Sequence, residues 1–149
     1  MAGYPTVSVP AGYAYGLPVG SEAADGSADG SADGAPLDGI VRDTKALAPL
    51  GIGSIAVMSN DPTDYPEDSF ENMKRVAREK GFPFPYVIDE TQEVARAYGT
   101  VCTPEFFGFD AGLNLEYHGR FDEMFTAMKR IAETGKGPEK QVPSVGCSI

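Results

Sequence analysis

The chain has 149 residues, with 12 Lys and Arg against 22 Asp and Glu, and its formal net charge is -10. That length suits one compact domain, and a hydrophobic content of 42% can supply a core, so the composition argues against a wholly disordered chain. The acidic balance disfavours a nucleic-acid binder, and no apolar run approaches the roughly 20 residues of a membrane span.

Cysteine and histidine are scarce, because the chain has two Cys and one His. Two cysteines cannot build a disulfide framework or a zinc cluster, and one His cannot complete a His-based metal site. We therefore expect no metal and no cofactor. The N-terminus lacks the basic and apolar regions of a secretory signal, and a cytoplasmic, reducing compartment fits best.

Residues 1–36 are expected to form a flexible acidic arm rich in Gly, Ser, Ala and Asp. Within this arm, residues 25–34 repeat a four-residue unit that offers nothing to bury. Its acids recur at every fourth position, whereas an EF-hand loop places them at alternate positions, so a linker is favoured over a calcium site. Residues 6–9 and 13–15 are candidates for short strands.

Residues 37–149 alternate between helical and extended patterns. Helices are predicted at 37–48, 66–80, 93–98 and 124–132, and strands at 55–58, 84–88, 106–109 and 113–117. Phe70, Val94 and Tyr98 are among the apolar residues predicted to face the core. The run 55–58 does not alternate with polar residues, which predicts a strand buried on both faces. The tail from Lys136 onward is predicted to be irregular.

This order of elements predicts an α/β fold in which helices flank a mixed sheet. A single strand between two helices needs parallel neighbours, and a hairpin closes an antiparallel edge. The pattern lacks a strand before the first helix. The N-terminal segment must supply that strand, or the sheet is one strand short.

A series of short motifs then follows in order along the chain. They are IAVMSND at 55–61, YPEDS at 65–69, FPFPY at 82–86, DETQEVA at 89–95, AYGTVCTPEFF at 97–107 and PSVGCSI at 143–149. Together they resemble the thioredoxin-fold redoxins of the AhpC/TSA, peroxiredoxin-like type, and the stretch 97–107 is the most specific. The resemblance implies a thioredoxin-like domain over 37–149 with a thiol redox or peroxide-reducing, antioxidant ancestry.

The chain departs from this pattern on its N-terminal side. In the family a cysteine motif lies at the end of the first strand, whereas no cysteine precedes Cys102 in this chain. The segment that follows residues 120–122 is also shortened. The domain 37–149 is therefore either incomplete or takes its first strand from elsewhere, and an altered chain and an unusual paralogue are both compatible with this.

Cys102 is the candidate nucleophile that remains. The resemblance implies a cis peptide bond between Thr103 and Pro104, beside the redox centre, which would leave the Thr103 backbone free to meet a substrate strand. Thr103 and Pro104 are therefore candidate substrate-binding residues. A reactive thiolate needs a depressed pKa, and Arg96 and Arg120 are the candidate cations. Alternatively, Cys102 is a small buried hydrophobe and Pro104 an ordinary trans proline at a strand start.

Two further residues bear on this chemistry. Cys147 lies in the C-terminal tail and would resolve a Cys102 intermediate if the tail folds back, although a bystander thiol is the alternative. His118 is the only histidine, so no catalytic triad can be built, and we expect it to be a surface residue.

The sequence thus predicts a redoxin-family oxidoreductase acting on disulfides or peroxides, with weak or lost activity because the usual first-helix cysteine is absent. Its partners would be a thiol reductant and a small disulfide or peroxide substrate, with no nucleic acid and no membrane. The alternative is a non-catalytic thioredoxin-fold module, in an altered or engineered chain, that binds a partner or serves as a scaffold.

Overall fold

The fold is described from a computed structural model of the chain. The structure describes residues 12–15 and 36–148. The acidic repeat at 25–34 and the candidate strand at 6–9 lie outside the described residues, and so does most of the predicted arm.

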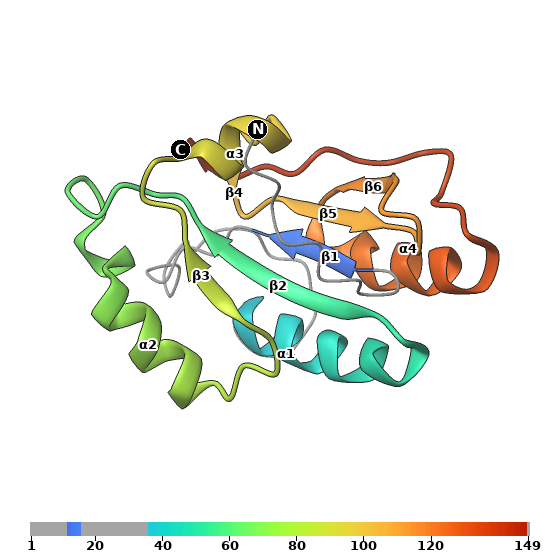
Figure 1. Cartoon of the computed structure of the whole chain (residues 1–149), viewed down its shortest axis with the longest axis horizontal. Helices are drawn as coiled ribbons and strands as arrows, with labels where there is room; N and C mark the ends of the chain where they lie inside the picture. Colours follow the sequence, from blue (N-terminus) through green and yellow to red (C-terminus); the bar gives the residue numbers. More distant parts are fainter. Residues whose placement is uncertain (1–11, 16–35, 149) are drawn as a thin grey trace, which may run out of the picture.

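A five-stranded mixed sheet forms the centre of the fold (Figure 1). Its strands are β1 Gly12–Tyr15, β2 Gly53–Met58, β3 Tyr86–Ile88, β5 Phe106–Phe109 and β6 Leu115–Gly119, in the order β3-β2-β1-β5-β6. Strands β1, β2 and β3 are parallel, whereas β5 runs antiparallel to β1 and pairs with β6 in a hairpin. The predicted α/β fold with a mixed sheet is confirmed.

Gly12–Tyr15 forms the strand that the sequence pattern lacks before the first helix. Ala14 pairs with Ile55 of β2 on one side and with Phe107 of β5 on the other, so β1 is the central strand. These four residues lie inside the segment 1–36 that the sequence predicts to be an arm. The sheet therefore takes its first strand from the N-terminal side of the acidic repeat.

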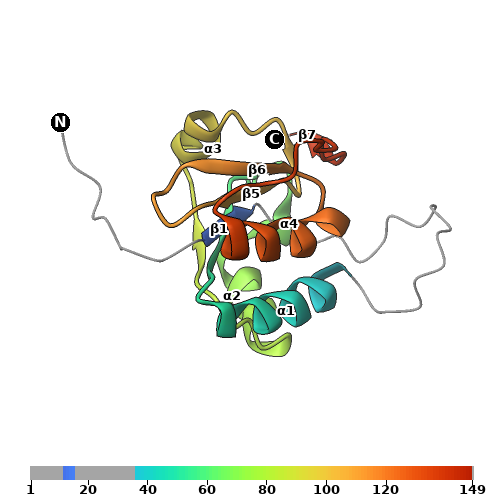
Figure 2. The same ribbon diagram turned by 90° about the vertical axis from the view of Figure 1, so that its right-hand side faces the viewer.

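Four α-helices within the described residues cover the two faces of the sheet. They are α1 Pro36–Leu47, α2 Phe70–Glu79, α3 Glu93–Tyr98 and α4 Phe121–Thr134, with 3-10 turns at Ala48–Leu50 and Pro66–Asp68. Figure 2 shows α1, α2 and α4 on one side and α3 on the other. Right-handed crossovers between β1, β2 and β3 place α1 and α2 on the same face. No helix in the described part of the chain is long and apolar enough to cross a membrane.

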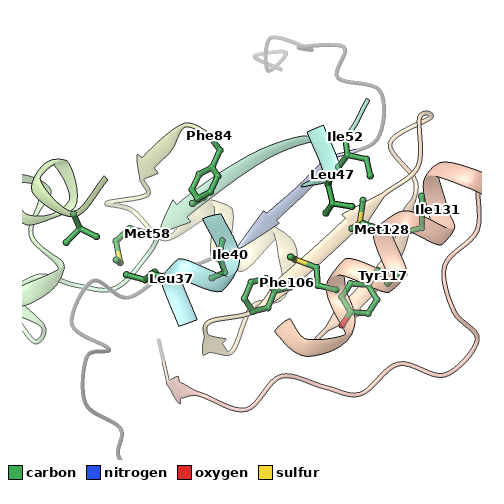
Figure 3. Packing of buried hydrophobic residues seen from close by; sticks show 14 of the residues in the cluster. Leu37, Ile40, Leu47, Ile52, Met58, Phe84, Phe106, Tyr117, Met128 and Ile131 are labelled. Atoms are coloured by element: carbon green, nitrogen blue, oxygen red, sulfur yellow. The ribbon is translucent and has the colours of Figure 1, made fainter. Parts of the chain in front are cut away.

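The main core lies between the sheet and the face covered by α1, α2 and α4 (Figure 3). Its buried side chains include Leu37, Ile40, Leu47, Met58, Met73, Phe106, Tyr117, Met124, Met128 and Ile131. Gly108 of β5 lies in the same layer, where an added Cβ would collide with the sulfur of Met128. The sheet and α4 thus pack closely because this position has no side chain.

Three apolar residues predicted to face this core are exposed instead. Phe70 is 50% exposed because Ser69 is extended (φ -61°, ψ 150°) and separates the 3-10 turn at Pro66–Asp68 from α2. The turn and the helix therefore do not share one apolar stripe. Val94 and Tyr98 are exposed because the short helix α3 buries only Ala95.

The prediction that 55–58 is buried on both faces is also wrong. Ala56 and Met58 are fully buried in the core, but Ile55, on the other face of β2, is exposed. Of the helices in the described residues, only the short α3 lies on that face (Figure 2).

A second, two-stranded sheet joins the tail to the rest of the fold. Its strands are β4 Cys102–Thr103 and β7 Cys147–Ser148, which are antiparallel. The chain after α4 runs past the outer edge of β6 to reach β4 (Figure 1). The predicted irregular tail is therefore irregular over most of its length but ends in a strand.

Candidate active site

The candidate site lies at the edge of the sheet where β1, β2 and β3 end and β5 begins. Tyr15, the last residue of β1, pairs with Phe106, the first residue of β5. The amide of Asp89, just after β3, donates to the carbonyl of Met58 at 2.7 Å. Open parallel sheets bind ligands at the carboxyl ends of their strands. The segment 101–105 enters this edge directly before β5.

The peptide bond between Thr103 and Pro104 is cis. Thr103 is buried, and its hydroxyl oxygen has no hydrogen-bond partner within the described residues. The Thr103 backbone, however, is paired: it faces Cys147 of the chain's own tail. β7 therefore lies beside Thr103, where the family resemblance would place a substrate strand.

The thiol of Cys102 is in surroundings that favour its protonated form. The residue is 9% exposed, and its Sγ makes a weak contact with the Ser144 carbonyl at 3.9 Å. Burial raises the pKa of the Cys102 thiol, and the negative charge of Glu105 raises it further. A thiolate is the reactive form of cysteine, so these surroundings disfavour the reactive form of Cys102.

The two arginines named as candidate cations are engaged elsewhere. Arg96 donates to the carbonyl of Thr91 at 2.7 Å, and Arg120 pairs with Asp122 at 2.7 Å. Neither interaction involves Cys102. The charge that acts on this thiol is therefore the carboxylate of Glu105.

Glu105 forms a partly buried contact with His118, which the sequence did not predict. The carboxylate is nearly fully buried, and its Oε1 lies 2.7 Å from His118 Nε2. Its other oxygen accepts a hydrogen bond from the Val101 amide at 3.2 Å. The His118 ring stacks on Phe107, with ring centroids 4.2 Å apart. This pair ties the segment 101–105 to β6 and makes His118 more than the surface residue that was expected.

The pairing of β4 with β7 brings Cys147 near Cys102, but these two residues are not opposite each other in the register. The register pairs Cys102 with Ser148 and Thr103 with Cys147. Cys102 and Cys147 therefore occupy non-paired positions of this two-stranded ladder.

A buried polar cluster supports the ends of β2 and β3. The Ser59 hydroxyl donates to Asp89 Oδ2 at 2.9 Å, and the same oxygen accepts from the Ala95 amide at 3.0 Å. Gln92 donates from its side chain to the Ser59 carbonyl at 2.9 Å. These contacts join α3 to the end of β2.

A second buried contact joins the same edge to the turn before α2. Asn60 Nδ2 donates to Asp68 Oδ2 at 2.7 Å. Burial and the negative charge of Asp68 raise the pKa of Tyr86, so that phenol stays protonated. Ser59, Asn60 and Asp68 lie in the motifs at 55–61 and 65–69. The spacing of these motifs, however, does not indicate which side chains bond to one another.

The described residues contain no group of three or more His, Cys, Asp and Glu side chains arranged to hold a metal ion. Glu105 with His118 is a pair only. The chemistry available at this edge is therefore that of a thiol, a carboxylate and an imidazole.

Comparison with known families decides the ancestry. The AhpC/TSA family model matches residues 37–118, more than half of the chain. The chain belongs to the AhpC/TSA family. The matched region contains Cys102, Thr103, Pro104 and His118, so the candidate site lies within the AhpC/TSA part of the molecule. A search of curated proteins found no match.

The chain is also similar to solved structures. An uncharacterized conserved protein from Geobacillus kaustophilus is 37% identical, with a TM-score of 0.77, over 95% of this chain and 77% of that one. A hypothetical protein from Sinorhizobium meliloti is 26% identical, with a TM-score of 0.80, over 95% and 80%. A peroxiredoxin 6 variant from Arenicola marina is 16% identical, with a TM-score of 0.58, over 93% and 70%, which shows the shared thioredoxin-like fold.

Proposed function

We propose that the chain is a thiol-dependent redoxin in which Cys102 is the reacting group and Thr103 and Pro104 position the substrate. The observation that supports this is the place of Cys102, directly before Thr103 and Pro104 at the carboxyl edge of the sheet. Its burial and the adjacent Glu105 make the activity weak at neutral pH.

The proposed reaction with a disulfide is an exchange. The Cys102 thiolate attacks one sulfur, a new S–S bond forms, the substrate's S–S bond breaks, and the leaving thiolate takes up a proton. With a peroxide, the thiolate attacks the terminal oxygen, an S–O bond forms as the O–O bond breaks, and a sulfenic acid results, while the leaving alkoxide or hydroxide takes up a proton to become alcohol or water. A thiol reductant would return Cys102 to the thiol and would itself be oxidised. Cys147 would instead resolve the intermediate by forming a disulfide with Cys102, with release of the substrate thiol or water, and a thiol reductant would then reduce that disulfide.

The test separates the two cysteines. Cys147→Ser keeps only Cys102, and Cys102→Ser keeps only Cys147. Each variant reacts with an aromatic disulfide across a pH series while the released thiolate is followed. We expect the Cys147→Ser variant to react slowly at pH 7 and faster as the pH rises. A Cys102→Ser variant that retained all of the protein's disulfide or peroxide turnover would contradict the proposal.

A second candidate function is a non-catalytic binding or scaffold module. It is favoured by the pairing of β7 with Cys102–Thr103, which fills the position where a substrate strand would lie. Turnover that depends on dithiothreitol, scales with protein and disappears after alkylation would count against this alternative.

The proposal extends to the partners and the location of the chain. The partners would be a small disulfide or peroxide and a thiol reductant, without nucleic acid or membrane. A cytoplasmic location would supply the reductant, because that compartment keeps thiols reduced.

A further inference from the structure

The C-terminal tail, defined here as residues 136–148, is fastened along the outer edge of β6. The start of the tail is held by Glu116, which we call its first anchor. The Glu116 carboxylate accepts hydrogen bonds from Lys136 Nζ at 2.8 Å and from the Gly137 amide at 3.1 Å. An added Cβ at Gly137 would collide with the Glu116 carbonyl, so the backbones meet directly there. The tail therefore starts in a fixed position.

The middle of the tail replaces a neighbouring strand. The side-chain amide of Gln141 accepts from the His118 amide at 2.8 Å and donates to the Glu116 carbonyl at 2.9 Å. One residue later, the Val142 carbonyl accepts from the Arg120 amide at 3.1 Å. Unpaired edge strands invite association with other chains, and these contacts close the edge of β6.

The end of the tail is fitted to the cis-proline segment. The Ser144 hydroxyl donates to the Gly119 carbonyl at 2.7 Å, and β7 then pairs with β4. An added Cβ at Gly146 would collide with the Thr103 carbonyl and would lie 3.2 Å from the Pro104 nitrogen. By contrast, the neighbouring Val145 is 94% exposed. The position of Gly146 thus admits only a residue without a side chain.

We propose that residues 143–148 are a releasable peptide ligand, held in cis by the backbone of Cys102–Thr103, and that the site selects glycine opposite the cis-proline segment. The class of ligand is an extended peptide that adds as a strand through main-chain hydrogen bonds. This goes beyond the proposed redox function, because strand addition requires no thiol chemistry.

Occupancy by the chain's own tail would keep other peptides out of the site in the intact chain. A segment tethered by a short linker competes at an effective concentration in the millimolar range, which exceeds that of most free peptides. Release of the tail would also uncover Cys102, because Ser144 contacts its sulfur. The same movement therefore opens the peptide site and exposes the thiol.

The test uses the full chain and displaces the tail with Gly146→Val, whose side chain collides with Thr103 and Pro104. The matched control is Val145→Thr, at a neighbouring residue that is exposed to solvent. The probe is a synthetic fluorescent peptide with the sequence of residues 143–149 and serine in place of Cys147, followed by fluorescence anisotropy. A second probe carries valine in place of Gly146.

We expect the first probe to bind Gly146→Val at least about tenfold more tightly than it binds the wild type or Val145→Thr, because the competing tail is displaced. The valine probe should bind none of them. Equal binding of the first probe to all three proteins, or no binding to Gly146→Val, would overturn the proposal, as would a dimer in which the tail pairs with a second copy.

A second measurement guards against a variant that fails to fold. Ser144→Ala removes only the hydrogen bond to Gly119 and leaves Gly146 in place. In a Cys147→Ser background, alkylation of Cys102 should be about fivefold faster with Ser144→Ala, since one hydrogen bond contributes about 1 kcal/mol. An unchanged rate in a folded protein would contradict release of the tail as the step that exposes Cys102.

Discussion

A thiol two residues before a cis proline has the position of a redox centre, yet the surroundings of Cys102 favour the protonated thiol. Burial is the larger cause of its raised pKa and Glu105 the smaller one. Because the folded state holds this proton more tightly than the unfolded state, the resulting stability is fully present below the unfolded pKa. It is lost as the pH rises through the folded pKa.

Glu105→Gln in a Cys147→Ser background should therefore lower the pKa of the Cys102 thiol by removing a negative charge. The pKa should remain above that of the denatured protein, because burial persists. Alkylation rates against pH, measured on native and denatured samples, check this. An identical profile with and without the Glu105→Gln substitution would mean that this carboxylate does not act on the thiol.

Glu105→Ala should destabilise the fold by about 2 kcal/mol, because the Val101 amide and His118 both lose their buried acceptor. Urea unfolding at pH 7 gives the free energy of unfolding. Glu139→Ala, at an exposed position of the tail, is the control and should change that free energy little. Equal effects of the two substitutions would argue against a structural role for the Glu105–His118 contact.

Single residues also show the limit of what the sequence could predict about the site. The place of Cys102 beside Thr103 and Pro104 follows from one continuous motif. The contact between Glu105 and His118 does not, because it joins the segment just before β5 to β6 and depends on how β5 and β6 align. The alternation through Leu115 and Tyr117 places His118 on the opposite face from Tyr117, which is a signal but does not identify a partner.

At the scale of elements, local chemistry predicted where helices end better than which face they bury. The predicted helices 37–48 and 124–132 end within two residues of α1 and α4, and Gly51 and Gly135, both with positive φ, terminate the 3-10 turn after α1 and α4 itself. Phe70 was predicted to face the core but is exposed, because an extended Ser69 interrupts the apolar periodicity. Periodicity identifies a stripe only while the backbone stays helical.

The packing of α4 on β5 yields a prediction at this scale. Gly108→Val would place a side chain where Met128 and Tyr117 already lie, so we expect a loss of about 2 kcal/mol in the free energy of unfolding. Thr126→Val, on the exposed side of α4, is the matched control. Denaturant unfolding compares the two. If both variants were as stable as the wild type, the close approach of the two elements would be wrong.

At the scale of the whole molecule, the tail connects the last helix to the candidate site, and its first anchor responds to pH. Hydrogen bonds from Lys136 and from the Gly137 amide lower the pKa of Glu116. The stabilisation is therefore present above the unfolded pKa of this carboxyl group and is lost as the pH falls through the folded value.

The Gly137 amide shift, followed by NMR, should titrate with an inflection below the ordinary Glu value of about 4.3. Lys136→Ala should move the inflection upward, because the hydrogen bond from Lys136 is the largest cause of the shift. Glu116→Gln should abolish it. An inflection that persists in Glu116→Gln would assign the titration to another group, and the anchor would need another explanation.

The central place of β1 has a consequence for how the chain is made. Gly12–Tyr15 leaves the ribosome before either of its neighbours, and its second neighbour, Phe106–Phe109, is among the last parts of the sheet to be synthesised. Pairings between such distant segments form slowly, because long loops must close first. Until then, one edge of β1 stays open, and the growing chain is most vulnerable to misassociation. Completion of the sheet therefore waits for the β5–β6 hairpin, which follows β1 by about 90 residues of chain.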